Sequence, residues 1–243
     1  MRFTRRSTGT LFVGGALGLT LAALAYPAML GVQTVSSSPT RIIAQTSAGP
    51  LTEADRDFVV KVRAAGLWEY PVGQMAIAKG TSPAVITAGQ HLVSGHAALD
   101  ATVRRIAPQL GITIPNLPSP QQQGFIATLT GDSKGTQFDS DFANILRITH
   151  GSIFNTVAKI RSTTENTLVR ALADQANVTV STTSRSWRRR GSSIQHGALP
   201  GDHPAEAARS DVTPPVPVPG APTVVLTPPP DVAGYPAPSP TAG

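Results

Sequence analysis

The sequence contains no cysteine among its 243 residues. Disulfide bonds, thiolate metal ligands and cysteine nucleophiles are therefore excluded together. The fold must instead be stabilised by a packed core. The absence of cysteine is compatible with an oxidising compartment outside the cytoplasm but does not by itself indicate one.

The sequence also lacks the motifs by which common enzymes are identified. No Ser-His-Asp order, phosphate-binding glycine loop or nucleophile elbow can be assigned. None of the glutamates is followed three residues later by histidine, which a di-iron centre requires on two helices. This pattern disfavours a standard ferroxidase, favours a non-enzymatic role and leaves enzymatic activity undecided.

Positive charge is scarce in the central part of the chain, although the formal net charge is +6. Residues 51–180 contain 11 Lys or Arg and 10 Asp or Glu, and much of the excess lies near the N-terminus and at residues 185–190. A nearly neutral domain does not offer the basic groove that phosphates require. We therefore expect no nucleic-acid partner.

Residues 1–35 predict a signal peptide or a membrane anchor. Three arginines within the first six residues precede a stretch, 7–40, that has no charged side chain. Its apolar run approaches the ~20 residues of a spanning helix, whereas residues 23–25 offer a small-x-small cleavage site. Either alternative predicts export. An anchor would hold the protein on the membrane, facing outside the cytoplasm, and a cleaved signal would leave it secreted or periplasmic.

The middle of the chain predicts helices. Residues 36–50 are rich in Ser and Thr and predict a flexible spacer, and residues 51–195 follow as one domain. Apolar residues then recur at spacings of three and four, which is typical of amphipathic helices. The segments expected to be helical are 52–79, 82–110, 136–160 and 162–176, with a short one at 119–129. This arrangement predicts an all-α, antiparallel four-helix bundle.

Capping residues fix the expected helix starts. A Ser or Thr followed three residues later by an acidic residue is a start signal, and a Ser before Pro is another. The expected caps are Thr52 with Asp55, Ser82, Thr136 with Asp139, and Ser162 with Glu165. Beyond Asn177 the run is β-branched and hydroxyl-rich, so a helix is doubtful there. Residues 196–243 are dense in Pro and Ala and predict a disordered or polyproline II tail.

Three ionisable residues lie on the predicted apolar faces of three different helices. Glu69 falls between Ala65 and Val72, His96 between Leu92 and Leu99, and His150 in the equivalent position of the third long helix. Because burying such groups without partners costs several kcal/mol, they should meet one another, a metal ion or water. A structural hydrogen-bond network, a metal site and exposure at the end of the bundle all remain open.

Two stretches carry a resemblance to a known family. DRDFVVKVRAAGLWEYPVGQMAIAKGTSPAVITAGQHLVSGH and FDSDFANILRITHGSIFNTVAKI resemble the domain-of-unknown-function 4142 family. The resemblance implies an exported protein with a ferritin-like helical bundle. Family members usually have Asp directly before the second-helix histidine, where this chain has Gly95. They usually carry a further histidine in the last helix, where this chain reads NVTVSTTSRSW.

Two functional expectations follow. The first is a non-enzymatic cell-envelope module that binds an unknown envelope protein or a small ligand. The alternative is a metal-binding or metal-dependent envelope protein that uses Glu69, His96 and His150 for a divalent ion such as zinc or iron. No cofactor is certain from the sequence, and the N-terminal segment is the expected membrane contact.

Overall fold

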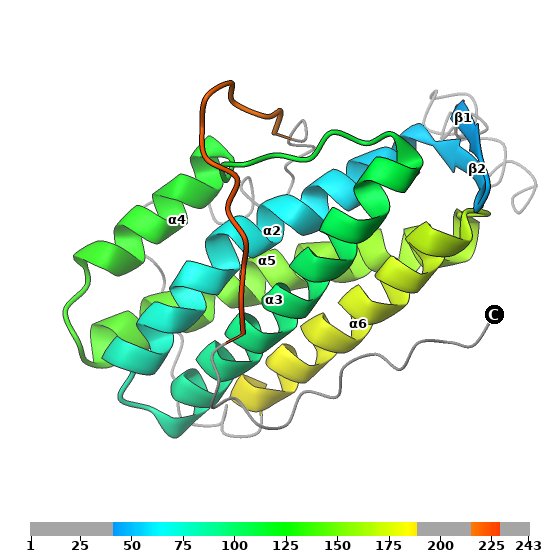
Figure 1. Cartoon of the computed structure of the whole chain (residues 1–243). Helices are drawn as coiled ribbons and strands as arrows, with labels where there is room; N and C mark the ends of the chain where they lie inside the picture. The colour runs from blue at the N-terminus through cyan, green and yellow to red at the C-terminus, as the bar shows by residue number, and fades with distance from the viewer. Residues whose placement is uncertain (1–40, 189–214, 229–243) are drawn as a thin grey trace, which may run out of the picture. The chain divides into compact units, whose positions relative to one another are not determined.

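The structure is a computed structural model that describes residues 41–188 and 215–228. These residues form five helices and one two-stranded sheet (Figure 1). The elements are β1 (Ile42–Thr46), β2 (Gly49–Thr52), α2 (Glu53–Lys79), α3 (Pro83–Leu110), α4 (Pro120–Gly131), α5 (Thr136–Thr163) and α6 (Thr167–Arg188). The predicted helical fold is confirmed. The expected signal or anchor, 1–35, lies outside the described residues.

The first two long helices begin and end where the sequence predicts. Thr52 and Asp55 form a reciprocal capping box at the start of α2, which continues through Pro71 to Lys79. Ser82 caps α3 by accepting from the Ala84 amide, and Gly111 ends it in the left-handed conformation with φ 65°. None of the helices in the described ranges combines the length and apolar character needed to cross a membrane.

The expected cap of α5 is wrong. Gly135 occupies the N-cap without a side-chain hydrogen bond, so Thr136 and Asp139 do not form a capping pair. The Asp139 carboxylate instead accepts from the Thr81 amide at 3.0 Å and hydroxyl at 2.7 Å, and from the Ser82 amide at 2.8 Å. Asp139 therefore fixes the turn between α2 and α3 to the start of α5, a long-range role that local spacing cannot reveal.

The last helix also differs from the expectation. The Asn166 side chain accepts from the Val169 amide at 3.2 Å, so Ser162 and Glu165 do not cap it. α6 then runs beyond Asn177 to Arg188, although the β-branched run made a helix doubtful. Burial explains the difference, because packing of an apolar face contributes more to helix stability in proteins than intrinsic propensity does. Within residues 167–185 of α6, the buried apolar residues are Val169, Leu172, Ala173, Ala176 and Val180.

Part of the expected flexible spacer is a β-hairpin. β1 and β2 pair in antiparallel register, with Thr46 opposite Gly49 at the turn. Gly49 has φ 107°, which a residue with a side chain rarely adopts. The hairpin contacts the start of α6, where the Thr167 amide donates to the Ala48 carbonyl at 2.9 Å. Tertiary hydrogen bonds therefore order a stretch whose composition is typical of loops.

The helices α2 and α3 lie unusually close to each other. A β-carbon on Gly73 would approach the Gly89 carbonyl oxygen to 2.9 Å, and one on Gly89 would approach the Gly73 oxygen to 2.7 Å. Both distances are shorter than a backbone contact allows, so these two positions require glycine. The close crossing brings the side chains of α2 and α3 into direct contact along their length.

Apolar packing forms two clusters along the helices. One contains Phe58, Val103 and Leu172, and the other contains Trp68 and Phe142. On α3, His96 lies in sequence between Leu92 of the second cluster and Leu99 of the first. On α5, His150 lies between Leu146 of the second cluster and Val157 of the first. The helices therefore bring a polar layer between two apolar ones.

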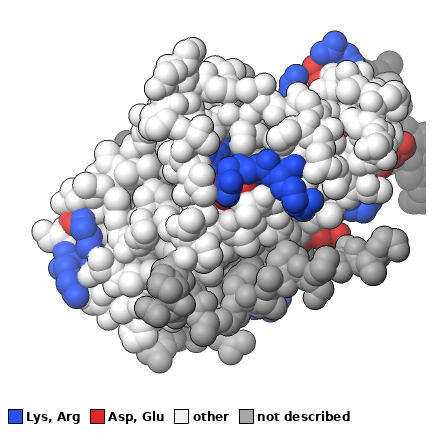
Figure 2. Space-filling model, in the orientation of Figure 1, with Lys and Arg blue, Asp and Glu red and all other residues white. Residues whose placement is uncertain are grey.

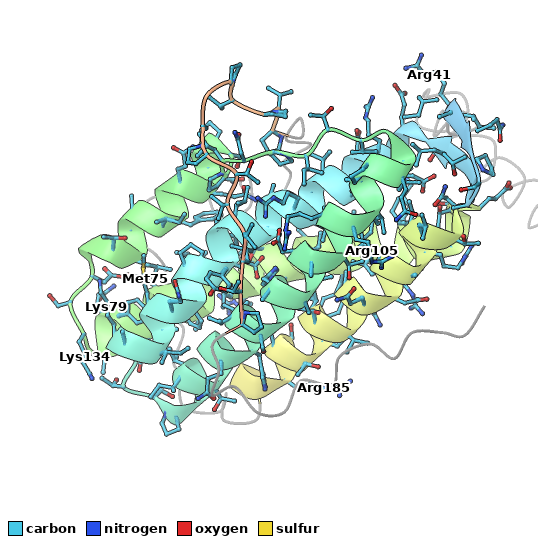
Figure 3. The ribbon with its side chains drawn as sticks, in the orientation of Figure 1. Arg41, Met75, Lys79, Arg105, Lys134 and Arg185 are labelled. Carbon is cyan, nitrogen blue, oxygen red and sulfur yellow. The ribbon has the colours of Figure 1, made fainter. Side chains whose placement is uncertain are left out.

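The short helix α4 is held at one end by Lys79. The Lys79 ammonium donates to the carbonyl oxygens of Leu129, Thr130 and Asp132 at 2.8–3.0 Å. These are carbonyls at the C-terminal end of α4, where a positive charge also interacts favourably with the helix dipole. Figure 3 shows Lys79 at the end of the molecule where α2 and α4 meet.

Candidate functional site

The three ionisable residues on the apolar faces meet at one carboxylate oxygen. Nε2 of His96 lies 2.9 Å and Nε2 of His150 lies 3.0 Å from Oε2 of Glu69. All three side chains are buried, with 3–7 % of each exposed. The structure therefore brings together the predicted site residues, which come from α2, α3 and α5, and excludes their exposure at the end of the domain.

The electrostatics of this Glu69 cluster favour an ionised carboxylate. Burial alone would raise the pKa of Glu69, but the charges and hydrogen bonds of His96 and His150 together outweigh burial and hold that pKa well below its ordinary value. An ionised carboxylate can only accept hydrogen bonds, so both Nε2 atoms must donate. The cluster is therefore a buried carboxylate that accepts two hydrogen bonds, one from each histidine.

The outer nitrogens of the two imidazoles have different surroundings. Nδ1 of His150 lies 3.3 Å from the hydroxyl oxygen of Ser184 on α6, so a fourth helix contributes to the cluster. Nδ1 of His96 is buried and has no hydrogen-bond partner among the described residues. It faces Gly66, where a β-carbon would lie 3.8 Å from it. The His96 ring is thus held on one side only.

The two sequence departures from the family pattern have structural counterparts. Gly95 faces α6, where a β-carbon would approach Cγ2 of Thr179 to 2.6 Å, so a larger residue would require the Thr179 side chain or the helix to shift. In the last helix, the region in which the family usually carries histidine presents the hydroxyl of Ser184 to His150. A hydroxyl can orient an imidazole, but it is a much weaker metal ligand than a histidine.

The cluster has the chemistry of metal ligands, but its nitrogens are already engaged. In residues 41–188 and 215–228, no group of three or more His, Cys, Asp or Glu side chains is disposed to hold a metal ion. Both Nε2 atoms are hydrogen-bonded directly to Glu69, so an ion could enter only by replacing these two protons. As arranged, the cluster is a hydrogen-bond network that links four helices.

A second buried polar group, one helical turn along α3, was missed by the sequence analysis. Arg63 on α2 and Asp100 on α3 form an ion pair with 1 % of each side chain exposed. Burial lowers the pKa of Arg63 while Asp100 acts in the opposite direction. The sequence feature that could have predicted this buried charge is Arg63 itself, which lies within the mostly apolar run VVKVRAAGLW. Fully buried charges are uncommon in proteins unless they are paired.

This ion pair binds the main chain of the proline-rich tail. A guanidinium nitrogen of Arg63 donates to the Val224 carbonyl at 2.7 Å, and the Leu226 amide donates to Oδ2 of Asp100 at 3.1 Å. The Tyr70 hydroxyl donates to the Thr227 carbonyl at 2.5 Å. Figure 1 shows this segment, orange to red, running across the face formed by α2 and α3.

Further along the same segment, one amide side chain makes three more main-chain contacts. Asn116, which precedes α4, donates to the carbonyls of Val218 and Ala221 at 2.9 and 3.0 Å and accepts from the Val218 amide at 2.9 Å. Gly220, with φ 78°, lies in the turn between them. Residues 215–228 of the tail, expected to be disordered or polyproline II, thus lie in a defined register on the helices. The remaining tail residues lie outside the described ranges.

One side chain of the segment is buried against the helices. Leu226 is 5 % exposed, whereas its neighbour Val225 is 51 % exposed. Cδ1 of Leu226 would lie 3.1 Å from a β-carbon on Gly66, so this leucine fills the space that the glycine leaves open. The same glycine faces Nδ1 of His96. Leu226 therefore closes the molecule beside the Glu69 cluster.

Comparison with known proteins identifies a family for most of the helical region. A family model described as "Domain of unknown function (DUF4142)" matches residues 41–187. No curated protein and no solved structure matches the chain. The match covers β1 to α6 and includes every residue of the Glu69 cluster and of the Arg63–Asp100 pair. The chain therefore belongs to the DUF4142 family.

Proposed function

We propose that this protein is a non-enzymatic binding module of the cell envelope, a ferritin-like four-helix bundle that holds an extended polypeptide on the face formed by α2 and α3. One observation carries the proposal: buried side chains of α2 and α3 bind the main chain of residues 215–228. Export and a membrane contact through the N-terminal segment are parts of the proposal that rest on the sequence.

The chemistry of the face suits a polypeptide better than other ligands. Its polar contacts are to carbonyl oxygens and amide N–H groups, which every peptide presents. Five of the fourteen residues in the segment are proline, which preorganises an extended chain and lowers the entropy lost on binding. Figure 2 shows basic side chains only in small separate groups on this face, which speaks against a polyanion as the ligand.

The proposal is tested by asking whether the segment behaves as a ligand. A protease site is inserted at residue 200 of the full chain, and the protein is cleaved there after purification. We expect the C-terminal fragment to remain bound and to exchange with a labelled synthetic peptide of residues 215–228, because the contacts need no covalent link. Fluorescence anisotropy follows the exchange, and circular dichroism checks that the helices stay folded. A labelled peptide that does not bind to folded, cleaved protein contradicts the proposal.

Metal binding is the second candidate function, favoured by the convergence of three ligand-type groups on one oxygen. Glu69, His96 and His150 would hold the ion, and Ser184 would orient His150. When bound, a divalent ion such as zinc or iron would replace the two Nε2 protons and neutralise the carboxylate. Deprotonated at Nε2, neutral His96 would carry its proton on Nδ1, which has no acceptor among the described residues, so this candidate is the weaker one.

Elemental analysis of untagged protein separates the two candidates. The metal candidate predicts about one ion of zinc, iron or manganese per chain, lost in the double variant His96→Ala, His150→Ala. His91→Ala is the matched control, because His91 lies on the same helix outside the cluster. Metal-free protein that takes up no zinc on dialysis, while the native chain remains folded, eliminates the candidate.

A further inference from the structure

We infer that Leu226 is the specificity anchor of the peptide site and that the chain keeps this site occupied by its own segment, so that other peptides are excluded. The inference rests on the proposed function and adds the identity of the selected side chain and the regulation of the site. The ligand it predicts is an extended peptide with one aliphatic residue in the position of Leu226 and prolines nearby, as Pro222 and Pro228 lie near Leu226 in the segment.

Selection among peptide sequences has to come from a side chain of the peptide, because the hydrogen bonds contact only its main chain. Arg63, Asp100 and Tyr70 contact carbonyls and an amide that any sequence would present. Leu226 is the only described residue of the segment that is buried, since Val225 on one side and Thr227 on the other are exposed. The main-chain hydrogen bonds therefore fix the register of the peptide. The space that holds the Leu226 side chain, here called the pocket, selects which residue can occupy that position.

The pocket is built for an aliphatic side chain. Its floor is Gly66, and Cδ1 of Leu226 lies 3.1 Å from the position of a β-carbon there. Nδ1 of His96 borders the same glycine and has no hydrogen-bond partner among the described residues. Because a leucine offers no hydrogen bond, the pocket is closed by shape and by exclusion of water. A charged side chain would have to be desolvated there, at a large cost.

Self-occupancy follows from the covalent link. The segment and the helices belong to one chain, so docking of the segment is an intramolecular step with a high effective concentration. A free peptide must compete with this local concentration. The intact chain should thus bind a free peptide far more weakly than a chain whose own segment cannot dock.

The test uses the full chain and a labelled peptide of residues 215–228. Leu226→Asp in the chain should displace the segment and strengthen binding of the labelled peptide by ~tenfold or more relative to the intact chain. The peptide carrying Leu226→Asp should not bind measurably to that variant, whereas the peptide carrying Val225→Asp should bind like the native one, because Val225 is half exposed. Fluorescence anisotropy measures the binding of the native peptide and of the two substituted peptides.

A substitution on the helix side supplies an independent readout. Gly66→Ala adds a methyl group that meets Leu226 at 3.1 Å and His96 only at 3.8 Å or more, so it affects the segment before the helices. Introduced together with Leu226→Asp in the chain, it should weaken peptide binding several-fold relative to Leu226→Asp alone. Helix content should not fall, since alanine favours a helix over glycine.

The outcomes distinguish the inference from the proposed function. Equal binding by the intact and Leu226→Asp chains would overturn self-occupancy, and equal binding of the two Asp-substituted peptides would overturn the anchor. Either result leaves the peptide-binding function intact. If no peptide binds the folded Leu226→Asp chain, the proposed function fails and the inference fails with it.

Discussion

Asp100→Ala is expected to lower the free energy of unfolding by about 3–5 kcal/mol. The substitution leaves the guanidinium of Arg63 as a buried charge whose carboxylate partner is gone, with only carbonyl oxygens left to accept from it. It also removes the acceptor of the Leu226 amide, so residues 215–228 should detach. Urea unfolding followed by circular dichroism measures the change in stability.

Two further variants locate the cause of this effect. Asp174→Ala removes an ion pair with Arg161 in which both side chains are about half exposed, and should cost no more than about 1 kcal/mol. The double variant Arg63→Met, Asp100→Leu removes both buried charges and should recover much of the loss, because desolvation of the pair is then avoided. If Asp100→Ala costs no more than Asp174→Ala, the buried pair does not stabilise the fold.

Glu69→Ala is expected to lower the free energy of unfolding by about 2–5 kcal/mol. The Nε2–H groups of His96 and His150 lose their shared acceptor and remain buried, and each unsatisfied donor costs about 1–3 kcal/mol. Glu165→Ala, at an exposed position, is the control and should change stability by about 0.5 kcal/mol or less. A Glu69→Ala protein as stable as this control would show that water replaces the carboxylate at no cost.

The contribution of Glu69 to the free energy of unfolding is expected to depend on pH. The pKa of Glu69 is lowered in the folded protein and is about 4.3 in an unfolded chain. Between the two values the unfolded chain binds more protons, so the contribution of Glu69 to stability is fully present above about pH 4.3. It decreases as the pH falls below that value and is lost as the pH falls through the lowered pKa of the folded state.

The isosteric variant Glu69→Gln measures this contribution. The difference in free energy of unfolding between the native chain and Glu69→Gln should be large at pH 7 and smaller at pH 3.5. Carboxylates that do not contact residue 69 titrate equally in both proteins, so their contributions cancel in this difference, which reports the cluster of Glu69, His96 and His150. A difference that stays constant or grows on acidification would contradict the lowered pKa.

Local sequence patterns determined the helices but not all of their ends. The capping box at Thr52 and the left-handed Gly111 were predictable, because each signal acts within one turn of its own helix. Asp139 was misassigned since its partners, Thr81 and Ser82, lie more than fifty residues away. The same reason explains why α6 extends beyond Asn177, where buried contacts with other helices outweigh low helix propensity.

The candidate site shows the same division. Spacing of three and four placed Glu69, His96 and His150 on apolar faces, which predicted that each would point inward but left exposure at the end of the bundle open. Periodicity gives the orientation of a side chain around its own helix axis, but it does not give the axial position of one helix against another. That both imidazoles reach the same carboxylate oxygen was therefore decided by the packing of α2, α3 and α5.

The sequence by itself determined that this chain folds into long amphipathic helices with an acid and two histidines turned inward. Only the tertiary structure decided that Arg63 pairs with Asp100 and that residues 215–228 lie across them. The physical reason is that hydrophobic periodicity is a local property of one segment. A buried ion pair and a docked extended chain instead depend on contacts between residues up to 161 positions apart.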